Sequence, residues 1–546
     1  MATGRCTPLA HISPFRFAPH LLAFGFAAAL GAQQADTRPR LRHLRITTSD
    51  VFAADDTRFL TRVVNALHWQ TRQEVVAREV FVQPGDRIDE ATAAEVERNL
   101  RALGLFADVT ARLVPTAKPD EVDLEITTRD RLTLAFGAGG SYVGGVSGFR
   151  AAVGETNLLG LGDRLVGSFS HDSEGEYRGS LAYTDLHVLD SWHTATVRVS
   201  RTDEGDSAGF ELRRPFKHLA DPRSHAVAIA QDETATDYYR GGDSLAEVPY
   251  RRGSLRADLT WGEGSRDNRR YLGLTLQLQQ LDYGTAQGPL APEIRVPGDT
   301  TSVLAGPTAT WRWVDGYRKV TGLDTLDFVQ DLTLGPSFTT LLGARWRDEQ
   351  GRDGALQPEA SCDLTLAAEP LGSLYTNLGL HGGARWDDGD AAGWYAGGFA
   401  RAFVLAAGGN TLAANLVFDA TEETQDLPAE LTLGEDNGLR GYRARLLSGT
   451  RRLRANLEHR FDTGIELATF RLGLVAFHDA GWMGRDGDLG GPLHSLGAGL
   501  RIGSKPLLGG GVLRIDVAKP LDDVIDQSDG WKVSVTVGQV FGFGGN

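Results

Sequence analysis

The segment 272–279, LGLTLQLQ, places an apolar side chain at every second position, with Gly, Thr or Gln between them. Successive side chains of a β-strand point to opposite faces, so this segment predicts a strand with one apolar and one polar face. The same alternation occurs at 195–200 and 513–517, and turns rich in Gly, Asp, Asn and Pro separate such segments from about residue 131 onward. The C-terminal three quarters of the chain is therefore predicted to be β-structure.

A β region of this length favours an antiparallel transmembrane barrel, in which one face of each strand contacts lipid and the other faces a polar lumen. A soluble β-sandwich shows the same alternation, but rarely continues over roughly 415 residues as one domain. At roughly 26 residues per strand and connection, the region 131–546 would hold about 16 strands. The predicted fold class is mainly β.

The composition agrees with a barrel and excludes other classes. The 546 residues are 41% hydrophobic, include 67 Gly and carry a formal net charge of −15. No uninterrupted apolar stretch approaches the ~20 residues that a spanning helix needs. The acidic balance argues against nucleic acid as a partner, which normally requires a basic surface.

The N-terminus has the pattern of an export signal. No acidic residue precedes Asp36, and the apolar segment 21–30, LLAFGFAAAL, follows two arginines. This pattern predicts a signal peptide over residues 1–32, although an N-terminal core helix is the alternative. Cys6 would be removed with the signal, which leaves Cys362 alone and excludes an intramolecular disulfide.

After a short linker at 33–37, residues 38–130 are predicted to form a small α+β domain with the order β-α-α-β-β. Thr71 and Glu74 have the spacing of a capping box at the start of one helix, and Asp89 is the expected N-cap of the next. Two alternating strands complete the domain. A generic α+β domain would show the same pattern.

Three segments of this domain nevertheless resemble a POTRA domain, the periplasmic domain that precedes the barrels of outer-membrane assembly factors. They are VFVQPGDRID at 80–89, NLRALGLFADV at 99–109 and EVDLEITTRDR at 121–131. The resemblance implies a periplasmic domain that binds incoming polypeptide by pairing with a strand edge. The alternative is a purely structural spacer.

The C-terminus resembles the terminal signal of outer-membrane barrels. Thr536-x-Gly538-x-x-Phe541-x-Phe543 has the polar residue, the glycine and the two aromatics of that signal, although three further residues follow it. The pattern would place both aromatic side chains on the outward face of the last strand, at the bilayer interface.

Internal motifs resemble the same proteins. Gly154, Asn157, Gly160 and Gly162 lie in GETNLLGLG, which is similar to an early-barrel hairpin motif, although it is also a Gly-rich turn. Segment 438–442, GLRGY, resembles the tip of a loop that folds back into the barrel, and segment 477–481, FHDAG, resembles the strand motif that receives it. Segment 495–521 is similar to the penultimate strands. Together these motifs identify the chain as a member of the bacterial surface antigen and outer-membrane assembly factor superfamily, in a branch with a single POTRA domain.

The alternation of side chains places Glu458 and Asp479 on the lumen face of neighbouring strands. The resemblance implies that the loop arginine, Arg440, enters the lumen and pairs with such carboxylates. The predicted loop lock consists of six residues: Arg440, Gly441, Tyr442, Glu458, Asp479 and Gly481. The alternative is that Arg440 is an ordinary exposed loop residue.

The sequence has no GxSxG, HExxH or Walker A motif, and the alternation places His478 on the opposite face from Asp479. We therefore expect no enzyme, no metal and no cofactor. The resemblance implies insertion or translocation of client polypeptides at the outer membrane. It allows periplasmic or membrane accessory proteins as further partners and leaves the choice between assembly factor and secretion transporter open. A passive porin or structural barrel, whose N-terminal domain docks a partner, is the alternative.

Overall fold

The computed structural model describes residues 36–53, 58–143, 146–173, 175–265, 267–326, 328–427, 430–485, 487–504, 511–524, 530–537 and 539–541. The chain forms two compact units, Met1–Arg38 and Pro39–Asn546, and the second contains both an N-terminal α/β module and a β-barrel. The predicted signal peptide lies outside the described residues. So do Gly538 and Phe543 of the terminal pattern.

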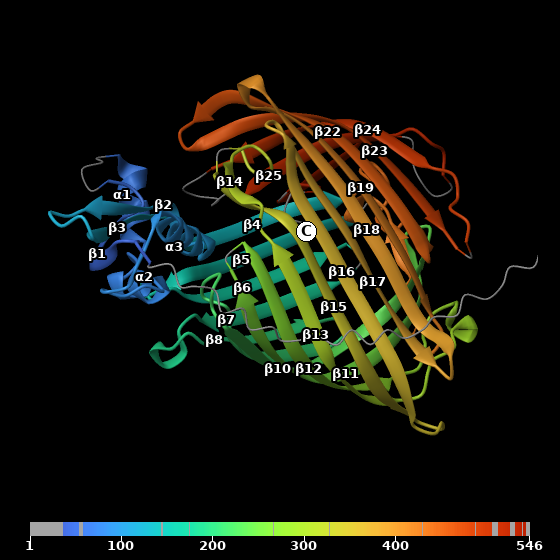
Figure 1. Cartoon of the computed structure of the whole chain (residues 1–546). Coiled ribbons are helices and arrows are strands. Elements are labelled where there is room, and N and C mark those ends of the chain that lie inside the picture. Colours follow the sequence, from blue (N-terminus) through green and yellow to red (C-terminus); the bar gives the residue numbers. More distant parts are fainter. Residues whose placement is uncertain are drawn as a thin grey trace, which may run out of the picture. The chain divides into compact units, whose positions relative to one another are not determined.

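The N-terminal module, drawn in blue in Figure 1, contains a three-stranded sheet and three helices. Its sheet order is β1-β3-β2, with β3 parallel to β1 and antiparallel to β2. The elements in chain order are β1 (Arg40–Ser49), α1 (Phe59–Ala66), α2 (Gln73–Glu79), α3 (Glu90–Ala102), β2 (Phe106–Pro115) and β3 (Glu121–Asp130). The predicted order lacks α1, an eight-residue helix whose N-cap, Arg58, makes no side-chain capping bond.

The core of the module is apolar, and its helices begin partly as the sequence predicts. Val76, Val96 and Leu124 are fully buried between the helices and the sheet. Asp89 is the N-cap of α3, because its carboxylate accepts a hydrogen bond of 2.8 Å from the Thr92 amide. The capping box expected at Thr71 is wrong: α2 begins after Arg72 without a side-chain cap, because the Thr71 hydroxyl accepts a hydrogen bond from another part of the chain.

The rest of the described chain forms a closed antiparallel barrel, coloured from teal to red in Figure 1. The strands before the long loop are β4 (Leu134–Val143), β5 (Val146–Leu158), β6 (Asp163–Asp172), β7 (Tyr177–Asp185), β8 (Thr194–Thr202), β9 (Asp206–Arg214), β10 (Arg223–Arg240), β11 (Asp243–Gly264), β12 (Asn268–Tyr283), β13 (Thr300–Trp313), β14 (Gly316–Val320), β15 (Gln330–Glu349), β16 (Ala355–Leu371), β17 (Leu374–Asp387), β18 (Asp390–Ala406) and β19 (Asn410–Glu423). The long loop contains β20 (Leu431–Leu433), η4 (Glu435–Asn437) and β21 (Leu447–Gly449). The barrel continues with β22 (Arg451–Leu467), β23 (Phe470–Gly484), β24 (Leu493–Gly503), β25 (Val512–Pro520) and β26 (Lys532–Val537).

Within the described residues, twenty of these strands form the ring, which closes between β26 and β4. The short strand β14 pairs with β15 alone, while β13 pairs directly with β15 and continues the ring. The ring therefore has more strands than the predicted 16. The excess arises early in the barrel, where β6 to β9 have only 9 or 10 residues each and short connections.

The two faces of the wall have the predicted character. Leu272 and Leu274 are more than half exposed on the outward face. Thr275, the next residue along the strand, is buried on the other face. No helix in the described part of the chain is long and apolar enough to cross a membrane. One wall face is thus suited to lipid, and the other to the polar side chains and the loop described next.

Candidate functional site: an arginine lock in the lumen

The site is formed by the loop between β19 and β22, which enters the barrel lumen. Strands β20 and β21 pair with each other to form a hairpin, and η4 leads to the tip. Gly441 at the tip has a φ of 87°, in the left-handed region, and a Cβ there would lie 3.1 Å from the Cβ of Ala518. Glycine therefore provides both the backbone conformation and the close approach of the loop to the wall.

Arg440 is 1% exposed and contacts three carboxylates. Its Nε and Nη2 donate to the two oxygens of Asp479 at 2.7 and 2.8 Å, which is a bidentate pair. Its Nη1 donates to Glu458 at 2.7 Å and to Asp516 at 3.4 Å. The guanidinium carbon also lies 3.4 Å from the ring centre of Phe477, a cation–π contact. The loop tip is thus held by charge and by ring stacking.

Other arginines neutralise the same carboxylates. Arg460 Nε donates to the second oxygen of Glu458 at 2.8 Å. Arg501 Nη1 donates to Asp516 at 2.6 Å, and Arg514 lies 3.3 Å from the same carboxylate. Four arginines and three carboxylates therefore form one buried network, in which Glu458 binds Arg440 through one oxygen and Arg460 through the other.

The structure brings the predicted residues of the lock together. A Cβ on Gly481 would lie 2.9 Å from Leu433 of the loop hairpin, so this glycine makes room for the loop. Tyr442 is fully buried beside Leu433 and Leu439, and its hydroxyl donates to the His494 carbonyl at 2.7 Å. The lock has an apolar part as well as a charged part.

Sequence reasoning missed several members of the network. Asn456 Nδ2 donates to Asp479 and to the Gly438 carbonyl, both at 2.8 Å, and so joins the loop tip to the wall. Strand alternation did place Asn456 on the lumen face beside Glu458, but alternation gives no partner. The residues that were not assigned to the lock are Asn456, Arg460, Phe477, Arg501, Arg514 and Asp516.

The early-barrel motif lies elsewhere, in the turn between β5 and β6, where it contacts the N-terminal module. Asn157 is fully buried, and its Nδ2 donates to the Trp69 carbonyl and to the Thr71 hydroxyl, both at 2.9 Å. Its Oδ1 accepts from the Gly162 amide at 2.9 Å, and the Gly160 carbonyl accepts from the amide of Arg72 at 3.0 Å. Gly154 lies in β5 against the Val166 side chain. The motif is a docking point as well as a turn.

The outward position expected for Phe541 is wrong. Thr536 lies in β26 as expected, but Phe541 is 2% exposed and its ring centre lies 6.0 Å from that of Phe403 in a buried cluster. The Phe541 carbonyl accepts a hydrogen bond of 3.0 Å from Arg460, which belongs to the lumen network. The polypeptide therefore turns into the lumen after β26, because Arg460 and Phe403 offer Phe541 a buried contact there.

The geometry provides no acid–base pair at His478. Its Nε2 lies 3.2 Å from Nδ1 of His494, whereas the adjacent Asp479 binds Arg440. In the part of the chain that the structure describes, no group of three or more His, Cys, Asp and Glu side chains is arranged to hold a metal ion. The carboxylates of the lock converge on a guanidinium instead.

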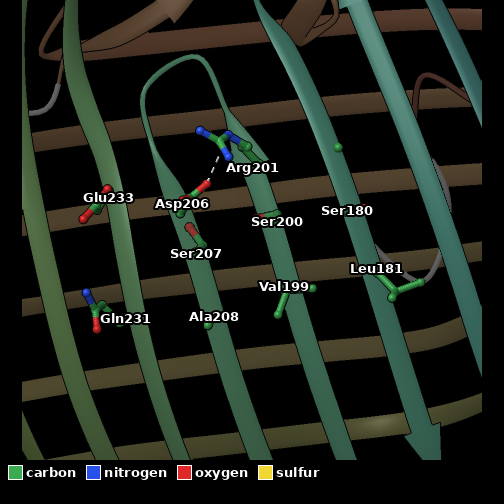
Figure 2. A pocket seen from close by; sticks show the side chains of 11 residues that line it. Ser180, Leu181, Val199, Ser200, Arg201, Asp206, Ser207, Ala208, Gln231 and Glu233 are labelled. Carbon is green, nitrogen blue, oxygen red and sulfur yellow. Dashed lines mark ion pairs between the residues drawn. The ribbon is translucent and has the colours of Figure 1, made fainter.

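A separate hollow of about 700 Å³ lies on the wall at β7 to β10 (Figure 2). Leu181 and Val199, which line it, are about half exposed, as outward-facing residues of this wall are. Arg201 and Asp206 form an ion pair of 3.6 Å across the β8–β9 turn. This hollow belongs to the outer surface and not to the lumen site.

Comparison with known proteins decides the family. Residues 157–541 match the Omp85 superfamily domain. The chain belongs to the Omp85 superfamily. This confirms the superfamily that the sequence motifs indicate, and it places the chain in the outer membrane.

Individual proteins similar to this chain match it over a shorter stretch or at low sequence identity. The outer membrane protein assembly factor BamA of Nitratidesulfovibrio vulgaris is 36% identical over an alignment of 174 positions, which covers 28% of this chain and 21% of that protein. The chain thus aligns with about a fifth of that relative's length. One similar solved structure is BamA from Haemophilus ducreyi lacking POTRA domains 1–3, with 14% sequence identity and a TM-score of 0.40; the match covers 92% of this chain and 85% of that chain. Another is CdiB from Escherichia coli, with 13% identity and a TM-score of 0.43; this match covers 92% of this chain and 76% of that chain.

Proposed function

We propose that this Omp85 protein inserts client polypeptides into the outer membrane or translocates them across it, and that the Arg440 loop holds the lumen in a closed state. The observation that carries the proposal is the burial of Arg440 among Glu458, Asp479 and Asp516 at the tip of a loop that enters the barrel. Because the loop tip lies inside the barrel, passage of a polypeptide through the lumen requires that this network release the tip.

We further propose that the N-terminal module, residues 38–130, is a periplasmic POTRA-like domain that captures client chain. Strand β1 pairs with β3 on one side. On its other side, the backbone hydrogen bonds of the described residues involve only 39–41, which pair with 85–88. The Thr48 carbonyl accepts a hydrogen bond of 3.1 Å from the Gln70 side chain, so residues 44–47 are the part of this edge that offers backbone groups to an added strand, which supports capture by β-augmentation.

The closure of the ring supports a site of insertion. Strand β26 has six residues, fewer than any other described strand of the ring. A short strand forms few ladder hydrogen bonds, so we propose that the closure between β26 and β4 is the seam of the wall that opens most readily. A client strand could pair there without the loss of a long ladder.

Photocrosslinking tests the proposed function on the full chain in proteoliposomes. A photoreactive side chain at Thr47, on the edge of β1, should crosslink to an added unfolded outer-membrane polypeptide. The matched control is the same group at Lys118, an exposed residue in the β2–β3 turn. Equal crosslinking at both positions would overturn capture by β1. A steady ion conductance that is unchanged by Arg440→Ala would favour the passive porin instead.

A further inference from the structure

The connection between β14 and β15 enters the lumen. We call residues 320–326 the luminal strap. Leu323 is fully buried and Val320 nearly so, in a cluster with three residues from strands that lie two to four places beyond β15 in the ring and with the C-terminal segment. The wall residues of this cluster are Tyr375, Phe403 and Ala413, from β17, β18 and β19. An exposed turn between two strands would leave these apolar side chains in water, so their burial stabilises the strap inside the barrel.

The strap extends across the lumen to strands that are distant from β15 around the ring. The Gly322 carbonyl accepts a hydrogen bond of 2.9 Å from the Thr411 hydroxyl of β19. The Leu326 side chain lies against Gly473 of β23 and Gly503 of β24, at positions where a Cβ would come within 2.9 and 3.3 Å of it. The two glycines thus leave bare backbone for Leu326 to pack on.

The same arginine that belongs to the lock also binds the strap. Arg460 Nη1 donates to the Leu323 carbonyl, Nη2 donates to the Phe541 carbonyl, and Nε donates to Glu458. Its guanidinium carbon lies 5.0 Å from the ring centre of Phe541. Arg460 therefore contacts the strap, the C-terminal segment and a lock carboxylate at once.

The lock and the strap belong to opposite ends of the barrel. The lock loop connects β19 to β22, whereas the strap connects β14 to β15 at the end that also carries the β5–β6 turn and the β18–β19 turn. The β5–β6 turn is the one that binds the N-terminal module through Asn157. Glu458 lies between the two ends, with Arg440 on one oxygen and Arg460 on the other.

We propose that the luminal strap and residues 539–541 close the end of the lumen next to the N-terminal module, and that Arg460 is the positioning residue that couples this closure to the Arg440 lock. A movement of the strap withdraws an acceptor from Arg460 and shifts its contact with Glu458, so the lock loosens when the strap leaves. The use of this coupling in client passage rests on the function proposed above. The closure itself does not.

An engineered disulfide tests the closure. A Cβ on Gly503 would lie 3.5 Å from the Cβ of Leu326, within the range that a disulfide spans. The variant Leu326→Cys/Gly503→Cys, made with Cys362→Ser, should form this bond in the full chain in proteoliposomes. The matched control is Leu326→Cys/Gly372→Cys, because nothing lies within 4 Å of a Cβ on Gly372. Absence of the bond in the test pair, or its formation in the control, would overturn the placement of the strap.

The readout is the insertion or translocation of an unfolded outer-membrane polypeptide, compared with and without reductant. Oxidation should reduce the rate at least tenfold in the test pair, reduction should restore it, and the control should not respond. An oxidised test pair that is as active as its reduced form would overturn the coupling while leaving the proposed function intact. Inactivity of the wild type and of every reduced variant would instead overturn the proposed function.

Arg460 needs a test that a merely structural role would not satisfy. Arg460→Gln should raise the rate of proteolysis within the lock loop at least tenfold, although the substitution lies outside that loop. Arg460→Lys should recover part of the protection, since an ammonium can keep the pair with Glu458 but cannot bind three acceptors in the geometry of a guanidinium. Unchanged loop protection in Arg460→Gln would refute the coupling.

Discussion

Arg440→Ala removes the one side chain that ties the loop tip to three carboxylates. Glu458 would keep Arg460, and Asp516 would keep Arg501 and Arg514. Asp479 would lose its bidentate pair and retain, among side chains of the described residues, only the hydrogen bond from Asn456. The cost of the substitution therefore concentrates on Asp479.

The size of the effect follows from this geometry. Removing one partner of a buried ion pair costs about 3–5 kcal/mol, because the other charge stays buried and unpaired. At about 1.4 kcal/mol per factor of ten, the equilibrium between docked and undocked loop should shift by about two to three and a half orders of magnitude. Arg440→Ala/Asp479→Asn should recover part of this loss, since the unpaired charge is then gone.

Limited trypsin digestion of the full chain in proteoliposomes measures the shift, because Arg443 and Arg445 follow the loop tip. Cleavage after these residues should accelerate in Arg440→Ala and slow again in the double variant. Retained mobility of the unheated barrel on a detergent gel controls for global unfolding. If Arg440→Ala leaves the loop as protected as in the wild type, or if Asp479→Asn gives no recovery, the lock does not hold the loop.

Three further outcomes are expected from the contacts described above. Gly481→Val should displace the loop hairpin, because a Cβ there lies 2.9 Å from Leu433, and it should raise trypsin cleavage of the loop. The control Gly253→Val in β11 should not, because nothing lies within 4 Å of a Cβ there and its φ is not in the left-handed region. Asn157→Ala leaves the buried Thr71 hydroxyl and Trp69 carbonyl without this partner, at about 1–3 kcal/mol, and hydrogen exchange at residues 69–72 should accelerate. Burial raises the pKa of Glu97, but hydrogen bonds from Lys319, from Arg101 and from the Ala111 amide bring it below its ordinary value of 4.5. The Glu97 carboxylate therefore stabilises the fold above about pH 4.5 and loses this effect as the pH falls through its lowered pKa. Glu97→Gln should lower the midpoint of thermal unfolding at pH 7 and lower it progressively less below pH ~4.5. A difference between wild type and variant midpoints that stays constant across this range would contradict the assignment.

The features of the fold that depend on strand alternation could be predicted, and those that depend on distant contacts could not. Alternation alone placed Glu458 and Asp479 on one face, because the period of a strand is local. It could not find Asp516, which reaches the same guanidinium from β25, two strands beyond β23 in the ring. The capping box at Thr71 fits the local pattern, but Asn157 binds the Thr71 hydroxyl instead. Tertiary contacts replaced the local ones there.

The error at Phe541 has the same origin. Side chains alternate between the two faces of a strand, so the position of a terminal aromatic predicts that it faces lipid. This prediction is correct only while the strand continues. Here the strand ends at Val537, and the next described residues leave the wall. The carbonyl of Phe541 binds an arginine whose own position is fixed by Glu458. No local signal in the C-terminal sequence records a partner that lies 81 residues away.

The charge balance of the lumen determines how its residues must be studied. The network holds four arginines and three carboxylates, and Glu458 and Asp516 are each shared by more than one arginine. Substitutions within such a network are not additive, because each removal changes the charge that its neighbours meet. Glu458→Gln should therefore loosen Arg440 and Arg460 together, whereas Asp479→Asn should act on Arg440 as the only arginine, besides its hydrogen bond from Asn456. A lock built from an isolated ion pair would show no such difference, so the comparison of these two variants separates a shared network from a single bond.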